Sequence, residues 1–335
     1  MADKIKIAMS WAAACGGCDV ALLDVEDRIL DLLDVADVVF WPVAMDFKRS
    51  DLQSMAPDSI DIGLFNGAVR TSEQLEDAKL FREKCKVLVA FGSCACFGGI
   101  PGLANLASRE ELFQTVYQDT VSTDNEAKTR PLTECTVDGC LLTLPVLHGA
   151  VRSLDQVVDV DCFMPGCPPT PERVLDAVGV IQAYAKEGKV PPKGTVLASD
   201  KALCEECPRS SSRRGGRMEK IVQPHEILAD PDRCFVDQGL ICMGIATRAG
   251  CGHRCIQANM PCRGCFGPTP EMLDPGAEAL SAFGSIAGEA NENDVSTDRM
   301  KAVVKSVRDP AGTFYRFTLP KAILHRRVAD QAKGR

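Results

Sequence analysis

The chain has 335 residues, of which 45% are hydrophobic and 25% are charged, and its formal net charge is −8. This length accommodates two domains, and the composition is typical of globular proteins. The negative charge argues against a nucleic-acid partner, no apolar stretch is long enough to insert into a membrane, and the N-terminus lacks an export signal, so we expect a cytoplasmic protein.

The first 190 or so residues alternate strand-like and helix-like patterns. Short apolar runs predict five strands, over Ile5–Trp11, Ala36–Ala44, Ile60–Asn66, Lys86–Gly92 and Val157–Phe163. Helical spacing of apolar residues predicts three helices, over Asp19–Leu33, Ser72–Lys84 and Pro171–Lys186. Strands that alternate with helices favour an α/β fold, here a flavodoxin-like, doubly wound parallel sheet.

The remainder of the chain has weaker secondary-structure signals. Residues 119–133 are polar and turn-rich, which indicates a surface insertion, and Gly188–Gly194 is typical of a linker. We therefore expect a flavodoxin-like domain over residues 1–190 and a mostly irregular, cysteine-rich domain over residues 195–335. The aromatic segment Gly312–Pro320, which follows a polar stretch at Asn291–Asp298, is expected to pack on the chain or on a partner.

Seventeen cysteines are the strongest chemical signal in the sequence. Four of them follow predicted strands, namely Cys15, Cys18, Cys94 and Cys167. Because parallel strands end at one edge of a sheet, these loops can bring four thiolates together. Eight more lie in the C-terminal region: Cys204, Cys207, Cys234, Cys242, Cys251, Cys255, Cys262 and Cys265. Twelve thiolates suffice for three four-cysteine [4Fe-4S] clusters, which together could carry electrons.

Other interpretations of the cysteines are possible. A reducing cytoplasm disfavours disulfides, but Cys204-x-x-Cys207 and Cys262-x-x-Cys265 also have the spacing of structural zinc sites. Glycines and prolines crowd the C-terminal cysteines. Binding of iron–sulfur clusters or of zinc would stabilise the fold of such a region. The remaining five are expected to be buried apolar, structural or unpaired residues: Cys85, Cys96, Cys135, Cys140 and Cys162.

Three motifs resemble the proximal-cluster motifs of [NiFe]-hydrogenase small subunits. They are Cys15-Gly16-Gly17-Cys18, Gly92-Ser93-Cys94-Ala95 with the following Gly98-Gly99-Ile100-Pro101, and Pro165-Gly166-Cys167-Pro168-Pro169. Weaker forms occur in the related quinone-reductase subunit of respiratory complex I, which lacks a cysteine-rich extension. The order of the C-terminal cysteines is most similar to the cytoplasmic methyl-viologen-reducing type, which in methanogens partners a heterodisulfide reductase.

The resemblance implies a ligand set for each of three [4Fe-4S] clusters. The proximal cluster would be bound by Cys15, Cys18, Cys94 and Cys167. The medial cluster would be bound by Cys251, Cys255, Cys262 and Cys265. The distal cluster would be bound by Cys204, Cys207, Cys234 and Cys242. The chain would then carry no catalytic residue, and would pass electrons from a nickel–iron large subunit to a small iron–sulfur subunit and a flavin-containing heterodisulfide reductase.

Two positions depart from the better-known uptake hydrogenases. Those have a histidine where Cys204 stands and often a proline near Cys255, so here we expect an all-cysteine distal site and four irons in the medial cluster. An additional thiolate should lower the distal potential. The alternatives are an electron-transfer subunit of a complex I-like or of a sulfur- or NAD(P)-linked complex, and a zinc-stabilised scaffold.

Overall fold

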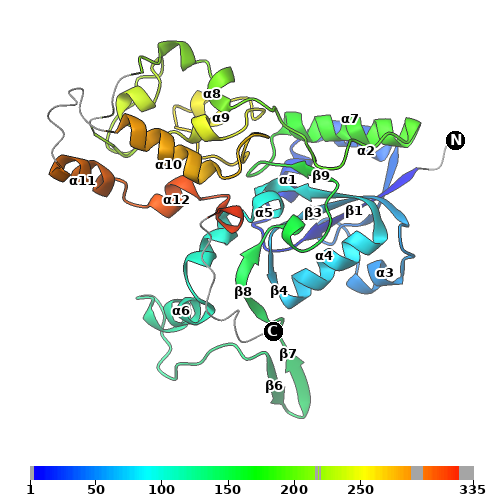
Figure 1. The fold of residues 1–335 in the computed structure, drawn as a ribbon. Helices are drawn as coiled ribbons and strands as arrows, with labels where there is room; N and C mark the ends of the chain where they lie inside the picture. The colour runs from blue at the N-terminus through cyan, green and yellow to red at the C-terminus, as the bar shows by residue number, and fades with distance from the viewer. Residues whose placement is uncertain (1–3, 216–217, 219, 288–296, 324–335) are drawn as a thin grey trace.

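Figure 1 shows the computed structural model, which describes residues 4–215, 218, 220–287 and 297–323. Six strands form one parallel sheet in the order β2-β1-β3-β5-β9-β10. They are β1 (Ile5–Trp11), β2 (Ala36–Phe40), β3 (Ile60–Asn66), β5 (Cys85–Phe91), β9 (Cys162–Met164) and β10 (Thr195–Val196). The first five follow the flavodoxin order, in which the chain reverses direction across the sheet after β2. The predicted fold class is therefore confirmed.

Helices cover both faces of this sheet (Figure 1). Three of them lie on one face and contact one another: α1 (Gly17–Leu23), α2 (Ile29–Leu33) and α7 (Pro171–Glu187). The other face carries α4 (Ser72–Lys84), with α3 (Arg49–Ser54) beside it. Along β5, Val87 and Val89 belong to the hydrophobic core on the side of α1, α2 and α7, and Leu88 and Ala90 belong to the core on the side of α3 and α4. A strand that is buried on both faces needs the continuous apolar run seen in the sequence.

Three predicted elements differ from the structure. The helix predicted over Asp19–Leu33 is interrupted after Leu23, and Glu26 has a left-handed backbone with φ of 55° that cannot continue an α-helix. The second strand ends at Phe40 and not at Ala44, because Pro42 lacks the N–H that a strand would use. The last predicted strand spans Cys162–Met164 only, because the chain before it forms a short 3₁₀ turn and a loop.

A long excursion separates Cys94 from Cys167. After α5 (Gly92–Phe97) the chain forms a 3₁₀ segment (Ile100–Leu106) and α6 (Arg109–Gln114), then a hairpin of β6 (Glu134–Val137) and β7 (Cys140–Thr143). It returns through β8 (Leu147–Arg152), which pairs with β4 (Val69–Thr71). We call residues 107–146 the arm. Figure 1 shows the arm projecting away from the sheet, and the predicted insertion at 119–133 is the loop within it.

The C-terminal part has its own hydrophobic core, which includes Phe235, Leu240 and Phe283. Its helices are α8 (Leu203–Glu206), α9 (Arg254–Gln257), α10 (Pro275–Ile286), α11 (Thr297–Ser306) and α12 (Pro310–Phe314). The expectation of little regular structure holds up to about residue 270, but α10 and α11 were not predicted. None of the described helices is long and apolar enough to cross a membrane.

The aromatic segment packs on the chain itself, and the preceding residues 291–296 lie outside the described residues. Phe314, Tyr315 and Phe317 are buried. Pro320 lies against the loop that follows α5: a Cβ atom added to Gly98 would come within 2.2 Å of its ring. The Gln156 side chain also donates a hydrogen bond to the Pro320 carbonyl, at 2.8 Å. The end of the described chain therefore holds a loop of the sheet domain.

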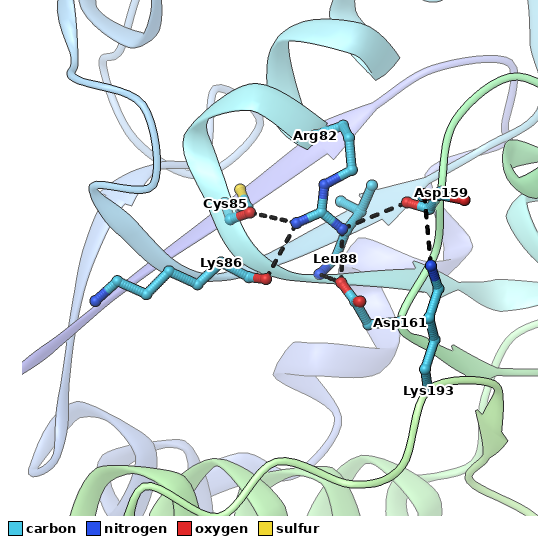
Figure 2. Close-up of polar contacts among 7 residues, drawn as sticks. All are labelled: Arg82, Cys85, Lys86, Leu88, Asp159, Asp161 and Lys193. Carbon is cyan, nitrogen blue, oxygen red and sulfur yellow. Dashed lines mark hydrogen bonds and ion pairs between the residues drawn. The ribbon is translucent and has the colours of Figure 1, made fainter.

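Arg82, at the end of α4, stabilises the edge of the sheet opposite the cysteine-bearing loops (Figure 2). Its guanidinium donates to the carbonyls of Cys85 and Lys86, at 2.5 and 3.0 Å, and forms an ion pair with Asp161 at 2.6 Å. The same carboxylate accepts the N–H of Leu88 at 2.8 Å. One side chain therefore joins the helix, the start of β5 and the loop before β9.

Arg82→Met should lower the free energy of unfolding by about 2 kcal/mol, because it leaves three backbone carbonyls, those of Cys85, Lys86 and Asp159, and a partly buried carboxylate without this donor. Chemical denaturation of the full chain measures this change. Arg28→Gln is the matched control, since its pair with Asp31 is solvent-exposed and exposed ion pairs contribute little to stability. Equal losses in the two variants would contradict the structural role of Arg82.

Candidate metal centres

The first group of thiols lies at the carboxyl edge of the parallel sheet. Cys15 and Cys18 follow β1, Cys94 lies in α5 after β5, and Cys167 follows β9. Burial raises the pKa of Cys94 to about 12, with further increases from the charges of Cys167 and Cys15. Burial also raises the pKa of Cys18, followed by the charges of Cys94 and Cys167. The structure thus brings together the four cysteines that the strand pattern predicted would meet.

Glycines make the close packing around these sulfurs possible. A Cβ atom on Gly92 would lie 2.3 Å from the sulfur of Cys18, and one on Gly99 would lie 2.5 Å from that of Cys94. Both glycines have positive φ, which a larger residue adopts only with strain. The N–H of Gly17 also points to the Cys15 sulfur, at 3.4 Å. The loops are shaped to surround sulfur atoms, and larger side chains do not fit there.

A second group lies in the C-terminal region around α8. Cys204 is in this helix, Cys207 follows it, and Cys234 and Cys242 come from the loops packed against it. Burial raises the pKa of Cys204 to about 12, and the charges of Cys242, Cys234 and Cys207 add to the increase. These are the four residues that the resemblance assigned to the distal cluster.

The third group lies between the other two. Burial raises the pKa of Cys265 to about 12, followed by the charges of Cys251 and Cys255. Burial also raises the pKa of Cys262, and the charges of Cys242, Cys265 and Cys251 act in the same direction. These are the four residues that the resemblance assigned to the medial cluster.

Two direct contacts join the three groups into a line. At one end, the hydroxyl of Ser93, directly before Cys94, donates to the carbonyl of Cys265 at 2.5 Å. At the other, the N–H of Cys262 donates to the sulfur of Cys242, at 3.3 Å. The first group is therefore joined to the third, and the third to the second.

Ser93, which makes the first of these contacts, was not identified by sequence reasoning. Its hydroxyl also accepts the N–H of Gly166, next to Cys167, at 3.2 Å. Ser93 is 1% exposed. Its only sequence signal is its position directly before Cys94 in a motif already singled out.

A cavity of about 590 Å³ opens between the first and third groups. Its walls include Cys167, Cys251, Cys255 and Cys265. Arg254 also lines it, and donates to both carboxylate oxygens of Glu172 on α7, at 2.8 and 3.0 Å. This arginine holds the Glu172 pKa at about 2. The ion pair connects the C-terminal region to the sheet domain beside the cavity.

The donor set fits iron–sulfur clusters. All twelve cysteines are free thiols. Burial raises the pKa of eight of them, so that ionising these without a bound cation is costly: Cys18, Cys94, Cys167, Cys204, Cys242, Cys255, Cys262 and Cys265. Among the described residues, no group of three or more potential ligands is close enough to surround a single metal ion. A four-iron cluster binds each thiolate through a different iron. The N–H groups that point to Cys15 and Cys242 are of the kind that tune cluster potentials.

The other five cysteines lie outside these groups or have partners of their own. Cys85, Cys96 and Cys162 are buried in the sheet domain, and the Cys96 thiol donates to the Ala90 carbonyl at 3.2 Å. In the hairpin, Cys135 lies opposite Leu142, and Cys140 lies opposite Val137. The two hairpin cysteines are therefore not cross-strand partners.

The sequence is similar to proteins of two related groups. Residues 15–181 match the family model described as "NADH ubiquinone oxidoreductase, 20 Kd subunit". Over 97% of its length, the chain is 36% identical to the F420-non-reducing hydrogenase iron-sulfur subunit of Archaeoglobus profundus, and it covers 99% of that protein. It is also 36% identical to an F420-non-reducing hydrogenase subunit of Methanothermobacter marburgensis, over 99% of this chain and all of the relative.

A solved structure is also similar. A chain of the recombinant [NiFeSe] hydrogenase from Desulfovibrio vulgaris Hildenborough superposes with a TM-score of 0.53. The alignment covers 80% of this chain and 95% of that chain at 19% identity, which supports the same fold. The full-length similarity to the two archaeal proteins decides the family, because it includes the cysteine-rich region that follows residue 181. The chain therefore belongs to the same family of F420-non-reducing hydrogenase subunits as these two proteins, and it is a subunit of an oxidoreductase.

Proposed function

We propose that this chain is the electron-transfer small subunit of a cytoplasmic [NiFe]-hydrogenase and binds three [4Fe-4S] clusters. The observation that carries the proposal is the line of three four-cysteine groups, joined by the contact of Ser93 with Cys265 and by that of Cys262 with Cys242. When bound, such clusters accept and release single electrons. The domain of residues 1–190 would hold the proximal cluster, and residues 195–335 the medial and distal clusters.

The residues of the chain hold and separate the three groups. Cys15, Cys18, Cys94 and Cys167 bind the proximal cluster at the sheet edge. Cys251, Cys255, Cys262 and Cys265 bind the medial cluster, and Cys204, Cys207, Cys234 and Cys242 bind the distal one. Backbone N–H groups and burial set the relative ease of reducing each site.

The positions of the two end groups suggest the direction of the path. Cys15, one of the proximal group, is exposed. A nickel–iron large subunit that oxidises H₂ can therefore bind there and deliver electrons. The distal group lies in the opposite part of the chain, where Cys204 and Cys207 are only partly buried. A small iron–sulfur subunit, linked to a heterodisulfide reductase, would accept electrons at that end. A complex I-like role would not account for the eight C-terminal cysteines.

Cys94→Ala should disconnect the path at its beginning. In the complex with the large subunit, we expect H₂-dependent reduction of a viologen dye to fall at least tenfold. The iron content should fall from about twelve to about eight atoms per chain, after iron of the partner subunits is subtracted. Dye reduction assays and metal analysis of the anaerobically purified complex measure these quantities.

Cys140→Ala is the matched control, because that thiol lies in the hairpin and outside the three groups. It should keep full iron content and full dye reduction. Undiminished dye reduction in the Cys94 variant would contradict the proposed path. Bound zinc in place of iron, in the wild-type complex, would contradict the proposed cofactors.

Cys204→His replaces an anionic thiolate with a neutral imidazole at the distal site. The loss of negative charge should raise the potential of this cluster by on the order of 100 mV and leave the other two nearly unchanged. A redox titration followed by electron paramagnetic resonance resolves the three potentials. A shift in the proximal potential, with none in the distal one, would show that Cys204 was assigned to the wrong site.

A further inference from the structure

Arg70, on β4, is a buried cation without a described partner. It is 7% exposed, and neither Nη1 nor Nη2 forms a hydrogen bond with the part of the chain that the structure describes. Burial lowers its pKa, and the nearby Arg109 lowers it further. A buried guanidinium without an anion or hydrogen-bond acceptors is costly. Its surroundings should therefore be completed by a group outside the described residues.

Two more basic side chains lie on the adjacent strand β8. Burial lowers the pKa of His148, followed by the charge of Arg152, and Arg70 contributes in the same direction. Burial also lowers the pKa of Arg152. The Nε2 atom of His148 is buried and lacks a partner among the described residues. We call Arg70, Arg109, His148 and Arg152 the cationic cluster.

No carboxylate is among the groups that shift the pKa of Arg70, His148 or Arg152. Those groups include other basic side chains but no aspartate or glutamate. The concentration of positive charge is notable in a chain whose net charge is −8. Arg109 and Arg152 are only partly buried, so the cluster reaches the molecular surface. Its charge and its unpaired donors fit a carboxylate group.

Exposed apolar side chains lie on the arm, which leads directly into β8. Leu144 and Val146, directly before β8, are 54% and 42% exposed, and Leu141 and Leu142 on β7 are 66% and 52% exposed. The hairpin projects away from the sheet (Figure 1), and both of its strands are mainly exposed. A two-stranded hairpin is marginally stable alone. Exposed apolar residues beside an unpaired arginine are typical of protein interfaces.

The strand that carries Arg70 begins beside the loop that leads to the proximal group. The residue before β4, Ala68, forms an antiparallel bridge with Ala13, only two residues before Cys15. The cationic cluster and the exposed Cys15 therefore flank the same loop. A protein that delivers electrons to the proximal group is placed to contact β4, β8 and the arm.

We infer that the cationic cluster and the exposed leucines of the arm form a docking surface for the large subunit, which contributes a carboxylate side chain to Arg70, Arg109 and Arg152. This inference rests on the proposed function for the identity of the partner. The bound carboxylate completes the hydrogen bonds of the arginines, and the leucines pack on an apolar surface beside it. A buried charge that is costly in the free chain thereby becomes a determinant of subunit affinity.

The test compares variants of the full chain in two measurements. The first is the dissociation constant with the large subunit at low and high salt, and the second is the thermal unfolding midpoint of the free chain. Arg70→Met should weaken the complex at least tenfold and should not lower the unfolding midpoint, because it removes an uncompensated charge. Arg152→Gln and Leu144→Asp should also weaken the complex, and the arginine variants should reduce its salt dependence.

Arg308→Gln is the matched control: it removes a charge from an exposed pair with Glu226 and should change neither quantity. Unchanged affinity in both arginine variants would overturn the inference. A second outcome would also overturn it: inorganic phosphate raises the unfolding midpoint of the wild-type chain but not of the Arg70→Met variant, and the two chains bind the large subunit equally well. If Arg70→Met does not fold, Arg152→Gln decides. A wild-type chain with its full iron content that fails to bind the large subunit contradicts the proposed function and the identity of this partner.

Discussion

The arrangement of the whole molecule depends on how closely two loops of the sheet domain approach the C-terminal region. Ser93 contacts the carbonyl of Cys265, which is 172 residues further along the chain, and also contacts Gly166 next to Cys167. The parallel sheet places these loops side by side, because β5 and β9 are neighbours that end at the same edge. A single buried hydroxyl therefore connects the two loops to each other and to the next group of thiols.

The same constraint bears on how a domain with little regular structure is held together. Near the second and third groups of thiols, short helices alternate with turns, and backbone N–H groups point to sulfur atoms where a helix or strand would use carbonyls. Two of these cysteines, Cys242 and Cys262, are part of the hydrophobic core of the region. It gains further support from the sheet domain, through the Arg254–Glu172 pair and the contacts of Pro320.

The sequence predicted the elements that local patterns determine. The β1, β3 and α4 boundaries agree with the structure, and α4 begins at a capping box between Thr71 and Gln74. The meeting of the first four thiols follows from sheet topology alone. Individual side-chain contacts between distant segments could not be predicted. The Ser93 hydroxyl and the Cys265 carbonyl, for example, are far apart in sequence. The hairpin and α10 were missed because their apolar residues lie in short segments among glycines and polar residues. The grouping of the eight later cysteines came from resemblance and not from spacing.

The position of Pro320 has a consequence for how the protein is made. The loop between α5 and the arm packs under Pro320, which lies far along the chain from Gly98. During synthesis from the N-terminus, that loop has no cover until the segment around Pro320 has been made. The sheet can form earlier, because its strands are complete by residue 196. The sheet domain therefore reaches its final packing only after the C-terminal segment has arrived.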